Sequence, residues 1–143
     1  MPSVIVVGTD GSAHAERALD EAIAIAARDQ AALHIVTAFP DSGMLREQVT
    51  SSSEPIHVNL SEVADMVLAR AAERAQASGI AAETHSEEAD PAEAILDVAQ
   101  RVNADLIVVG SRGLSGLKRF VIGSVSSKVS QHAHSNVMIV RGG

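Results

Sequence analysis

The sequence predicts an α/β fold in which a five-stranded parallel sheet is covered by helices on both faces. Residues 4–7 (VIVV) and 106–109 (LIVV) are continuous, largely β-branched runs, which are typical of strands buried on both faces. Segments with strand character alternate with segments of helical periodicity, and such units fold as parallel strands joined by right-handed crossovers. The 143 residues are enough for one domain with its own core. We therefore expect a single domain spanning residues 1–143.

The first part of the chain contains two predicted strands and a helix between them. After the strand at residues 4–7, apolar residues recur at helical spacing up to about Arg28. They are Ala15, Ala18, Leu19, Ala22, Ile23 and Ala26. Residues 32–38 form the second predicted strand, which Pro40 stops. The polar, serine-rich residues 41–56 are expected to form a long loop.

A second helix is predicted from Asn59 or Ser61 to Ser78, followed by Gly79 in the position of a C-terminal cap. The residues expected to face the core from this helix are Val63, Val67, Ala71 and Ala75. Residues 80–87 alternate only weakly in polarity and are predicted as the third strand.

The last part of the chain contains two helices and two strands. Asp90 and Pro91 predict a helix start, because Asp is a good cap and Pro is favoured in the first turn. The inward positions of this helix are Ala94, Ile95, Val98, Ala99 and Val102. Residues 106–109 are the fourth predicted strand, residues 124 to about 134 the last helix, and residues 137–140 the last strand.

The most economical strand order for this succession is 3-2-1-4-5. In this order the first and fourth strands are neighbours, and the segments that follow them leave in opposite directions. Such a switch opens a crevice at the carboxyl ends of the strands, where ligands generally bind. The loops that begin at Gly8 and Gly110 are therefore expected to meet at one site.

The segment after the fourth strand, residues 110–124, reads GSRGLSGLKRFVIGS. Gly110, Gly113 and Gly123 can let backbone N–H groups approach a phosphate, and Gly123 with Ser124 opens a helix whose N-terminus favours an anion. The hydroxyls of Ser124 and Ser126 would be further donors. The alternative is that these glycines only make turns. The spacing matches neither the Walker loop nor Gly-x-Gly-x-x-Gly.

Charge is distributed unevenly along the chain. All 18 acidic residues lie in residues 1–105, whereas residues 106–143 contain five basic residues and no acid. The five are Arg112, Lys118, Arg119, Lys128 and Arg141. An anionic ligand is therefore expected at the glycine-rich segment. The net charge of −7 and the presence of only two aromatic residues argue against general nucleic-acid binding, which needs a basic face and usually aromatic platforms.

The composition narrows the class further. The absence of Cys excludes disulfides, zinc–thiolate sites and thiol nucleophiles. Residues 1–8 are too short and too uncharged for a signal peptide, and no apolar run approaches the roughly 20 residues that a membrane span needs. We expect a cytoplasmic protein that does not contact membranes.

The pattern Gly110-x2-Gly113-x9-Gly123-Ser124, with residues 6–12 (VVGTDGS) and 137–140 (VMIV), resembles the ATP-binding branch of the universal stress protein family. The resemblance covers nearly the whole chain. It implies a flavodoxin-like domain, of the adenine nucleotide alpha hydrolase-like type, that dimerises and holds ATP with slow or no hydrolysis. The nucleotide-binding residues it implies are Gly8, Thr9, Asp10, Ala38, Gly110, Arg112, Gly113, Gly123, Ser124, Val125 and Ser126.

Several side chains have more than one interpretation. Asp10 could hold Mg²⁺, bond a ribose hydroxyl or cap the first helix, although Ser12 is an equally good cap. Arg112 is expected to meet phosphate, with a solvated side chain as the alternative. Phe39 is a neighbour of adenine or a plain core residue. Two more cations, Lys118 and Arg119, would raise the local potential, and the histidines His132 and His134 are read as surface residues because their spacing makes a poor metal pair.

The last strand is predicted to lie at an edge of the sheet. Val137, Met138, Ile139 and Val140 carry no charge or proline that would block pairing with another chain. We expect a two-fold homodimer through this strand, the alternative being an edge covered by the chain's own loops.

Three functions fit these observations. The first is an ATP-binding regulator in stress adaptation, whose loop at residues 41–56 responds to nucleotide and presents a surface to an unknown protein partner. The second is a slow ATPase or autophosphorylating enzyme that uses Arg112 and a metal near Asp10, although no general base accompanies them. The third is a cyclic AMP or AMP sensor. No catalytic residue is assigned.

Overall fold

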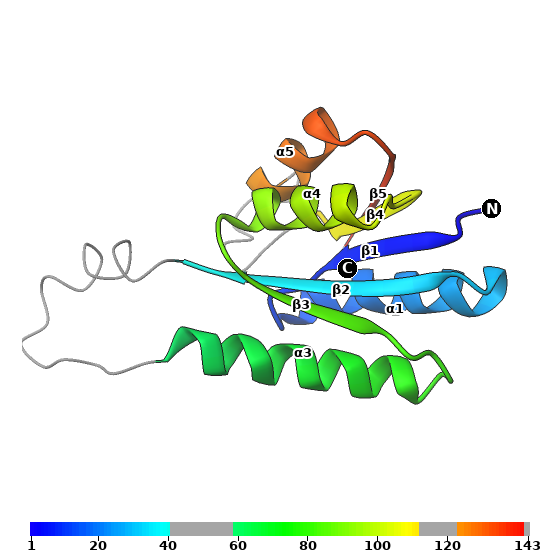
Figure 1. The fold of residues 1–143 in the computed structure, drawn as a ribbon, viewed down its shortest axis with the longest axis horizontal. Coiled ribbons are helices and arrows are strands. Elements are labelled where there is room, and N and C mark those ends of the chain that lie inside the picture. The colour runs from blue at the N-terminus through cyan, green and yellow to red at the C-terminus, as the bar shows by residue number, and fades with distance from the viewer. Residues whose placement is uncertain (41–58, 112–122, 142–143) are drawn as a thin grey trace, which may run out of the picture.

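The computed structural model describes residues 1–40, 59–111 and 123–141. Strands and helices alternate through these residues as the sequence predicts (Figure 1). The elements are β1 (Val4–Gly8), α1 (Ala13–Asp29), β2 (Ala32–Phe39), α3 (Leu60–Gln76), β3 (Glu83–Glu88), α4 (Pro91–Arg101), β4 (Leu106–Gly110), α5 (Ser124–His132) and β5 (Asn136–Val140). The predicted loop at residues 41–56 lies outside the described residues.

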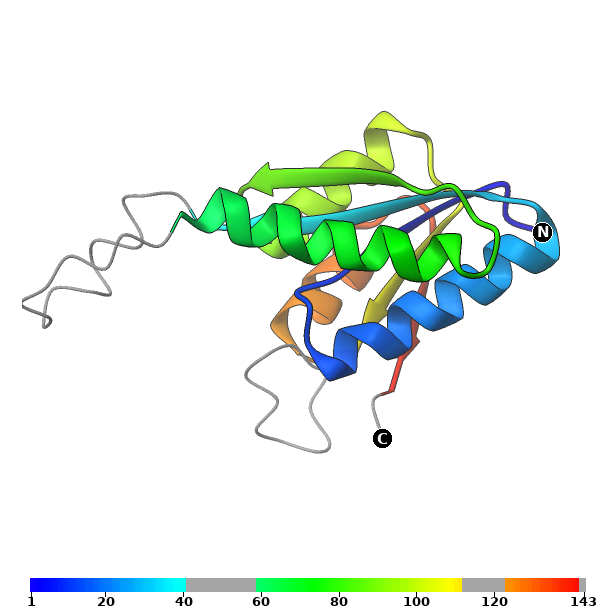
Figure 2. The same ribbon diagram turned by 90° about the horizontal axis from the view of Figure 1, so that it is seen from below.

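The five strands form one parallel sheet of order β3-β2-β1-β4-β5, which confirms the predicted topology. Helices cover both faces: α1 and α3 lie on one side, and α4 and α5 lie on the other (Figures 1 and 2). The register pairs Ile5 of β1 with Leu33 of β2 and with Leu106 of β4. The sheet therefore separates two hydrophobic cores, each between one face and one pair of helices.

The strands predicted to be central are indeed buried on both faces. Ile5 and Val7 of β1 pack in the core under α1 and α3, while Val6 between them packs under α4 and α5. All three side chains are fully buried. Because successive residues of a strand point to opposite faces, a continuous apolar run is what a doubly covered strand requires.

The helix faces predicted for α1 and α4 are confirmed, but the face predicted for α3 is partly wrong. The buried residues of α3 are Ala64, Leu68, Ala71 and Ala75, whereas Val63 is 47% exposed. The predicted stripe used four-residue steps throughout, and each such step overshoots a full turn by about 40°. Three steps in succession therefore carry the stripe off the core face, and a stripe that mixes spacings of three and four remains on it.

The connection from α3 to β3 explains why β3 starts later than predicted. Gly79 has φ of +77°, a conformation that favours glycine, and the N–H of Ile80 donates to the carbonyl of Ala75. Ile80 and Ala82 then pack against the core before the strand itself begins at Glu83. The apolar side chains of Ile80 and Ala82 therefore hold the segment before β3 against the core. The weak alternation in the sequence suggested that this segment was part of the strand.

Of the four helices in the described residues, three begin with a side-chain cap. Ser12, Asn59 and Asp90 accept backbone N–H groups at the starts of α1, α3 and α4, whereas α5 begins after Gly123 with no side-chain cap. The first N–H groups of α5 therefore remain available to another acceptor. In the described part of the chain, no helix has the length and apolar character needed to cross a membrane.

Candidate functional site

A pocket lies where β1 and β4 end side by side. The chain leaves β1 towards α1 on one face of the sheet and leaves β4 towards α5 on the other face, so the carboxyl ends of these strands form the expected crevice. The pocket has a volume of about 360 Å³. Its walls are formed by Gly8, Thr9, Asp10, Ala15, Val36, Ala38, Pro91, Ile95, Val109, Gly110, Gly123, Ser124, Val125 and Ser126.

The turn after β1 forms one side of the pocket. The N–H of Thr9 donates to the carbonyl of Val36 at 2.9 Å, so the sheet pairing continues one residue past the strand. Asp10 is exposed, and its Oδ1 accepts from the N–H of Ser12 at 2.9 Å. Ser12 in turn caps α1 by accepting from Ala15. One Asp10 oxygen therefore shapes the turn, and the cap of the helix is Ser12.

Gly8 allows a close approach between β1 and α4. A Cβ at this position would lie 2.4 Å from Cδ1 of Ile95 and 3.0 Å from its Cγ1. Ile95 is itself 4% exposed and lines the pocket. Any side chain on Gly8 must therefore displace a wall of the pocket, so this glycine has a packing role whether or not a ligand is bound.

The N-terminus of α5 forms the opposite side. The N–H of Gly123 donates to the carbonyl of Ser111 at 2.8 Å, which fixes the start of the helix beside the end of β4. The first intrahelical bond runs from Ser127 N–H to the Gly123 carbonyl. The N–H groups of the three residues between, Ser124, Val125 and Ser126, have no acceptor within the helix and lie at its positive end.

The hydroxyl of Ser126 does not match its predicted role as a donor to a ligand. Ser126 is 1% exposed, and its Oγ donates to the carbonyl of Gly123 at 3.0 Å. A serine in the first turn of a helix often bonds to nearby backbone in this way. The contribution that Ser126 can make to a ligand is its backbone N–H, whereas the side chain of Ser124 is exposed.

The remaining walls are aliphatic. Ala38, which the family resemblance implies as a nucleotide-binding residue, lines the pocket, as do Val36, Pro91 and Ile95, which the sequence analysis does not identify. Val36 could have been found, because it precedes Ala38 by two residues on the same face of β2. Phe39 is half-buried and is not among the residues that line the pocket.

One of the five basic residues counted in the C-terminal part of the sequence is paired with acidic residues near the pocket. Lys128 of α5 lies 3.3 Å from Asp90 and 3.4 Å from Glu93, and the bond to Asp90 raises the pKa of Lys128. This cation therefore links the middle of α5 to the N-terminal end of α4. Four residues of the predicted site segment, namely Arg112, Gly113, Lys118 and Arg119, lie outside the described residues.

A second hollow lies at the other end of the sheet. It has a volume of about 420 Å³ and is lined by residues that include Gln100, Asn103, His132 and His134. Both histidines are exposed, in agreement with their interpretation as surface residues. This hollow lies at the amino ends of the strands, away from the glycine turns, and the pocket at the carboxyl ends is the better candidate site.

The two edges of the sheet differ in character. β5 pairs with β4, and its apolar residues are only partly buried. Val137 and Ile139 pack against the core under α4 and α5, whereas Met138 and Val140 pack against the core under α1. At the opposite edge, β3 has the sequence ETHSEE. Charges protect an edge from pairing, so β5 is the less protected of the two.

The sheet order, the two layers of helices and the crevice at the carboxyl ends together define a flavodoxin-like α/β domain. The profile of the universal stress protein family matches residues 1–141, and the chain belongs to this family. The universal stress protein YxiE of Bacillus subtilis (strain 168) is 36% identical over 144 residues, which cover 96% of this chain and 97% of the relative.

Solved structures agree with this assignment. A universal stress protein in complex with cAMP is 33% identical, with a TM-score of 0.71 and coverage of 97% of this chain and 96% of that chain. The universal stress protein from Archaeoglobus fulgidus in complex with dAMP is 25% identical, with a TM-score of 0.72 and coverage of 94% of each chain. Both similarities extend over nearly the whole domain.

Proposed function

We propose that this chain is an ATP-binding regulatory protein and that its nucleotide occupies the pocket between β1, β4 and the N-terminus of α5. The observation that carries the proposal is the combination of aliphatic walls with a helix N-terminus that has no side-chain cap. An adenine base needs apolar surfaces and a few backbone partners, whereas a phosphate chain needs N–H donors and a positive helix end. Both environments occur within one pocket.

The proposed contacts divide between the two sides of the pocket. Val36, Ala38 and Ile95 would enclose the base, and the N–H groups of Ser124, Val125 and Ser126 would hold phosphate oxygens. Gly8, Thr9 and Asp10 would lie near the ribose and phosphates. The second oxygen of Asp10 is a candidate ligand for Mg²⁺, which usually binds through one or two carboxylates together with substrate phosphates.

Gly110 and Gly123 complete the proposed phosphate site, together with Arg112 and Gly113 from the segment between them. In this proposal, Arg112 supplies the charge that Lys128 cannot supply fully, because Lys128 bonds to Asp90 and Glu93.

A mononucleotide or cyclic nucleotide is the second candidate ligand. Relatives have been solved with cAMP and with dAMP, and the pocket volume of about 360 Å³ is near the lower end of the usual range for ligand sites, roughly 300–1,000 Å³. The protein would then sense cAMP or AMP. The three N–H groups that lack an acceptor within α5 and the basic residues of the glycine-rich segment favour the longer phosphate chain of ATP.

We propose a regulatory role in stress adaptation rather than efficient catalysis. Among the residues that line the pocket, Asp10 is the single carboxylate, and it already shapes its own turn. Phosphoryl transfer needs a group that orients the attacking water or hydroxyl. Slow hydrolysis or autophosphorylation remains the enzymatic alternative, with Arg112 and Mg²⁺ stabilising charge. We further propose a homodimer through Val137–Val140 and an unknown protein partner that recognises the nucleotide-bound form.

Calorimetric titration of the purified protein with ATP, ADP, AMP and cAMP, each with and without Mg²⁺, tests the proposal. We expect ATP to bind most tightly and Mg²⁺ to strengthen its binding. Tighter binding of cAMP or AMP would favour the sensor, and phosphate release that keeps pace with added ATP over hours would favour the enzyme. Absence of binding by every nucleotide would contradict the proposal.

A matched pair of variants localises the ligand. Ala38→Phe places a large side chain in the pocket, whereas Ala32→Phe makes the same change on the same strand at an exposed position. We expect the first change to weaken nucleotide binding at least about tenfold, which corresponds to about 1.4 kcal/mol. The second should leave the affinity unchanged. Equal affinities in the two variants, with native circular dichroism spectra, would exclude this pocket.

A further inference from the structure

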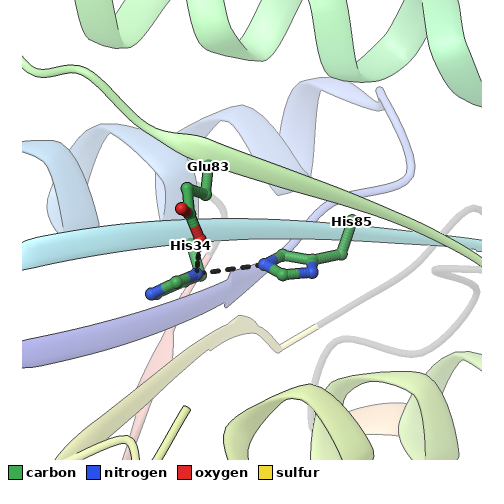
Figure 3. Close-up of side chains that lie close together, drawn as sticks. All are labelled: His34, Glu83 and His85. Carbon is green, nitrogen blue, oxygen red and sulfur yellow. Dashed lines mark hydrogen bonds and ion pairs between the residues drawn. The ribbon is translucent and has the colours of Figure 1, made fainter. Parts of the chain in front are cut away.

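Three side chains with metal-binding atoms converge on the sheet, and none of them lines the nucleotide pocket. His34 comes from β2, and Glu83 and His85 come from β3 (Figure 3). The strand register pairs His34 with Glu83, and it pairs Val36 with His85. All three side chains therefore point to the face of the sheet that α4 and α5 cover.

The distances within this cluster suit a metal ion. Nδ1 of His34 lies 3.0 Å from Nε2 of His85 and 3.3 Å from a carboxylate oxygen of Glu83, and all three ligand atoms lie within 4.8 Å of one another. Zinc binds imidazole nitrogen and carboxylate oxygen at roughly 2.0–2.2 Å, so two ligands of a tetrahedral ion lie about 3.4 Å apart. The side chains thus need only small rotations to share one ion.

Hydrogen bonding alone satisfies this cluster incompletely. Nδ1 of His34 faces both Nε2 of His85 and the Glu83 carboxylate, so a proton on it would have to serve two acceptors at once. If His85 carries the proton instead, it donates to His34, and the carboxylate then faces a nitrogen lone pair. A metal cation accepts all three lone pairs together.

We propose that His34, Glu83 and His85 form a binding site for a divalent transition metal of the zinc class. Two imidazoles and one carboxylate are a ligand set that zinc uses, with a fourth position left for water or another ligand. Magnesium and calcium prefer oxygen ligands, so this set discriminates against them. The 74% exposure of the Glu83 side chain gives a hydrated ion access from solvent, while His34, with 11% of its side chain exposed, supplies a fixed nitrogen.

The surroundings of the cluster favour a cation. Glu87 lies two residues beyond His85 on the same face of β3 and pairs with Arg101 of α4, so its negative charge offsets the positive charge of Arg101 in part. Glu83 adds a negative charge within the cluster itself. Neutral imidazole is the form of histidine that binds metals.

A metal at this site would connect β2 to the edge strand β3. Such a bridge closes across the sheet and stabilises the folded chain, because the three ligands come together only on folding. The site does not depend on the proposed nucleotide binding, since none of its three residues lines that pocket. The two proposals can therefore fail separately.

Titration of chelator-treated, nucleotide-free protein with ZnCl₂ tests the metal site. We expect one zinc ion per chain and a rise in the unfolding temperature. His85→Ala should lower the zinc affinity at least about 100-fold, because even the outer partners of metal ligands change affinity by roughly 10–100-fold. His132→Ala, which removes an exposed histidine elsewhere, should leave the affinity unchanged.

A spectroscopic measurement does not depend on the folding of any variant. Co²⁺ added to the wild-type protein should give the visible absorption of a tetrahedral nitrogen and oxygen site, and one equivalent of Zn²⁺ should abolish it. Absence of stoichiometric zinc binding, or equal binding by wild type and by His85→Ala with a native circular dichroism spectrum, would overturn the proposal. Loss of binding in His132→Ala would place the metal elsewhere and overturn it as well.

Discussion

The contact between Gly8 and Ile95 allows a quantitative test of the packing at the pocket wall. The added Cβ of Gly8→Ala would lie 2.4 Å from Cδ1 of Ile95, whereas carbon atoms in good contact are about 3.5–4.0 Å apart. The methyl group must therefore retreat by about 1.1–1.6 Å within a buried site. Overpacking of this kind costs about 1–3 kcal/mol, offset by about 0.4–1 kcal/mol from the reduced freedom of the unfolded chain. We expect a net loss of about 1–2 kcal/mol in the free energy of unfolding.

Ile95→Val provides the matched background, because it removes Cδ1 and keeps a branched side chain. By itself it should cost about 0.5–1.5 kcal/mol. With Cδ1 gone, the nearest remaining atom lies at the position of Cγ1, 3.0 Å from the new Cβ, which small adjustments relieve. Gly8→Ala should then cost less than about 0.5 kcal/mol, so the two changes should couple by more than about 0.5 kcal/mol.

Urea unfolding followed by circular dichroism, carried out on all four members of this cycle, measures the coupling. A cost of Gly8→Ala that is equal in the two backgrounds, to within about 0.5 kcal/mol, would refute the assigned contact. Nucleotide affinity should follow the same pattern, since the displaced Ile95 lines the proposed site. It should fall in Gly8→Ala and recover in the double variant.

Three further predictions concern other parts of the fold. The hydroxyl of Ser3 and the N–H groups of Ser3 and Val4 all donate to Asp105 and lower its pKa. These bonds to the ionised carboxylate stabilise the folded state at pH values above the ordinary aspartate pKa, and the stabilisation is lost as the pH falls through the lowered pKa. Asp105→Asn should therefore reduce the unfolding temperature most near neutral pH, and a difference from wild type that stays constant down to strongly acidic pH would contradict this. Gly79→Ala should lower the free energy of unfolding by about 1 kcal/mol because of the positive φ alone, since nothing lies within 4 Å of the added Cβ. An unchanged free energy of unfolding in urea would show that this turn rearranges without strain. Leu68→Ala should cost about 2–5 kcal/mol, whereas Val63→Ala on the exposed side of the same helix should change stability by less than about 0.5 kcal/mol, and similar losses would contradict the observed face of α3.

The sequence predicts the fold well because its signals are local and mutually consistent. The continuous runs in β1 and β4 and the helical spacing in α1 and α4 each reflect burial on a particular face, so they could be interpreted from residue type alone. The α3 stripe could not, because the helix offers two apolar tracks, one through Val63 and one through Ala64. Only packing against β2 and β3 decides between them.

The candidate site is predictable to a smaller extent. Glycines after strands indicated where the pocket lies, but the role of Gly8 against Ile95 depends on an approach between two elements that no local pattern encodes. The hydroxyl of Ser126 bonds within its own helix, a choice set by the geometry of the first turn. The sequence does not predict the cluster of His34, Glu83 and His85, because His34 and His85 are 51 positions apart and only the register of β2 with β3 brings them together.

The contrast between the two edges of the sheet has a consequence for assembly size. If two copies join through β5, the combined ten-stranded sheet ends at β3 on both sides, where Glu83, Glu87 and Glu88 of each chain repel a third copy. A protein in which one edge strand can pair with another copy and the other edge strand repels it forms a closed dimer and cannot polymerise by adding strands. The acidic strand would thus act as a terminator that keeps the protein from growing into a fibre.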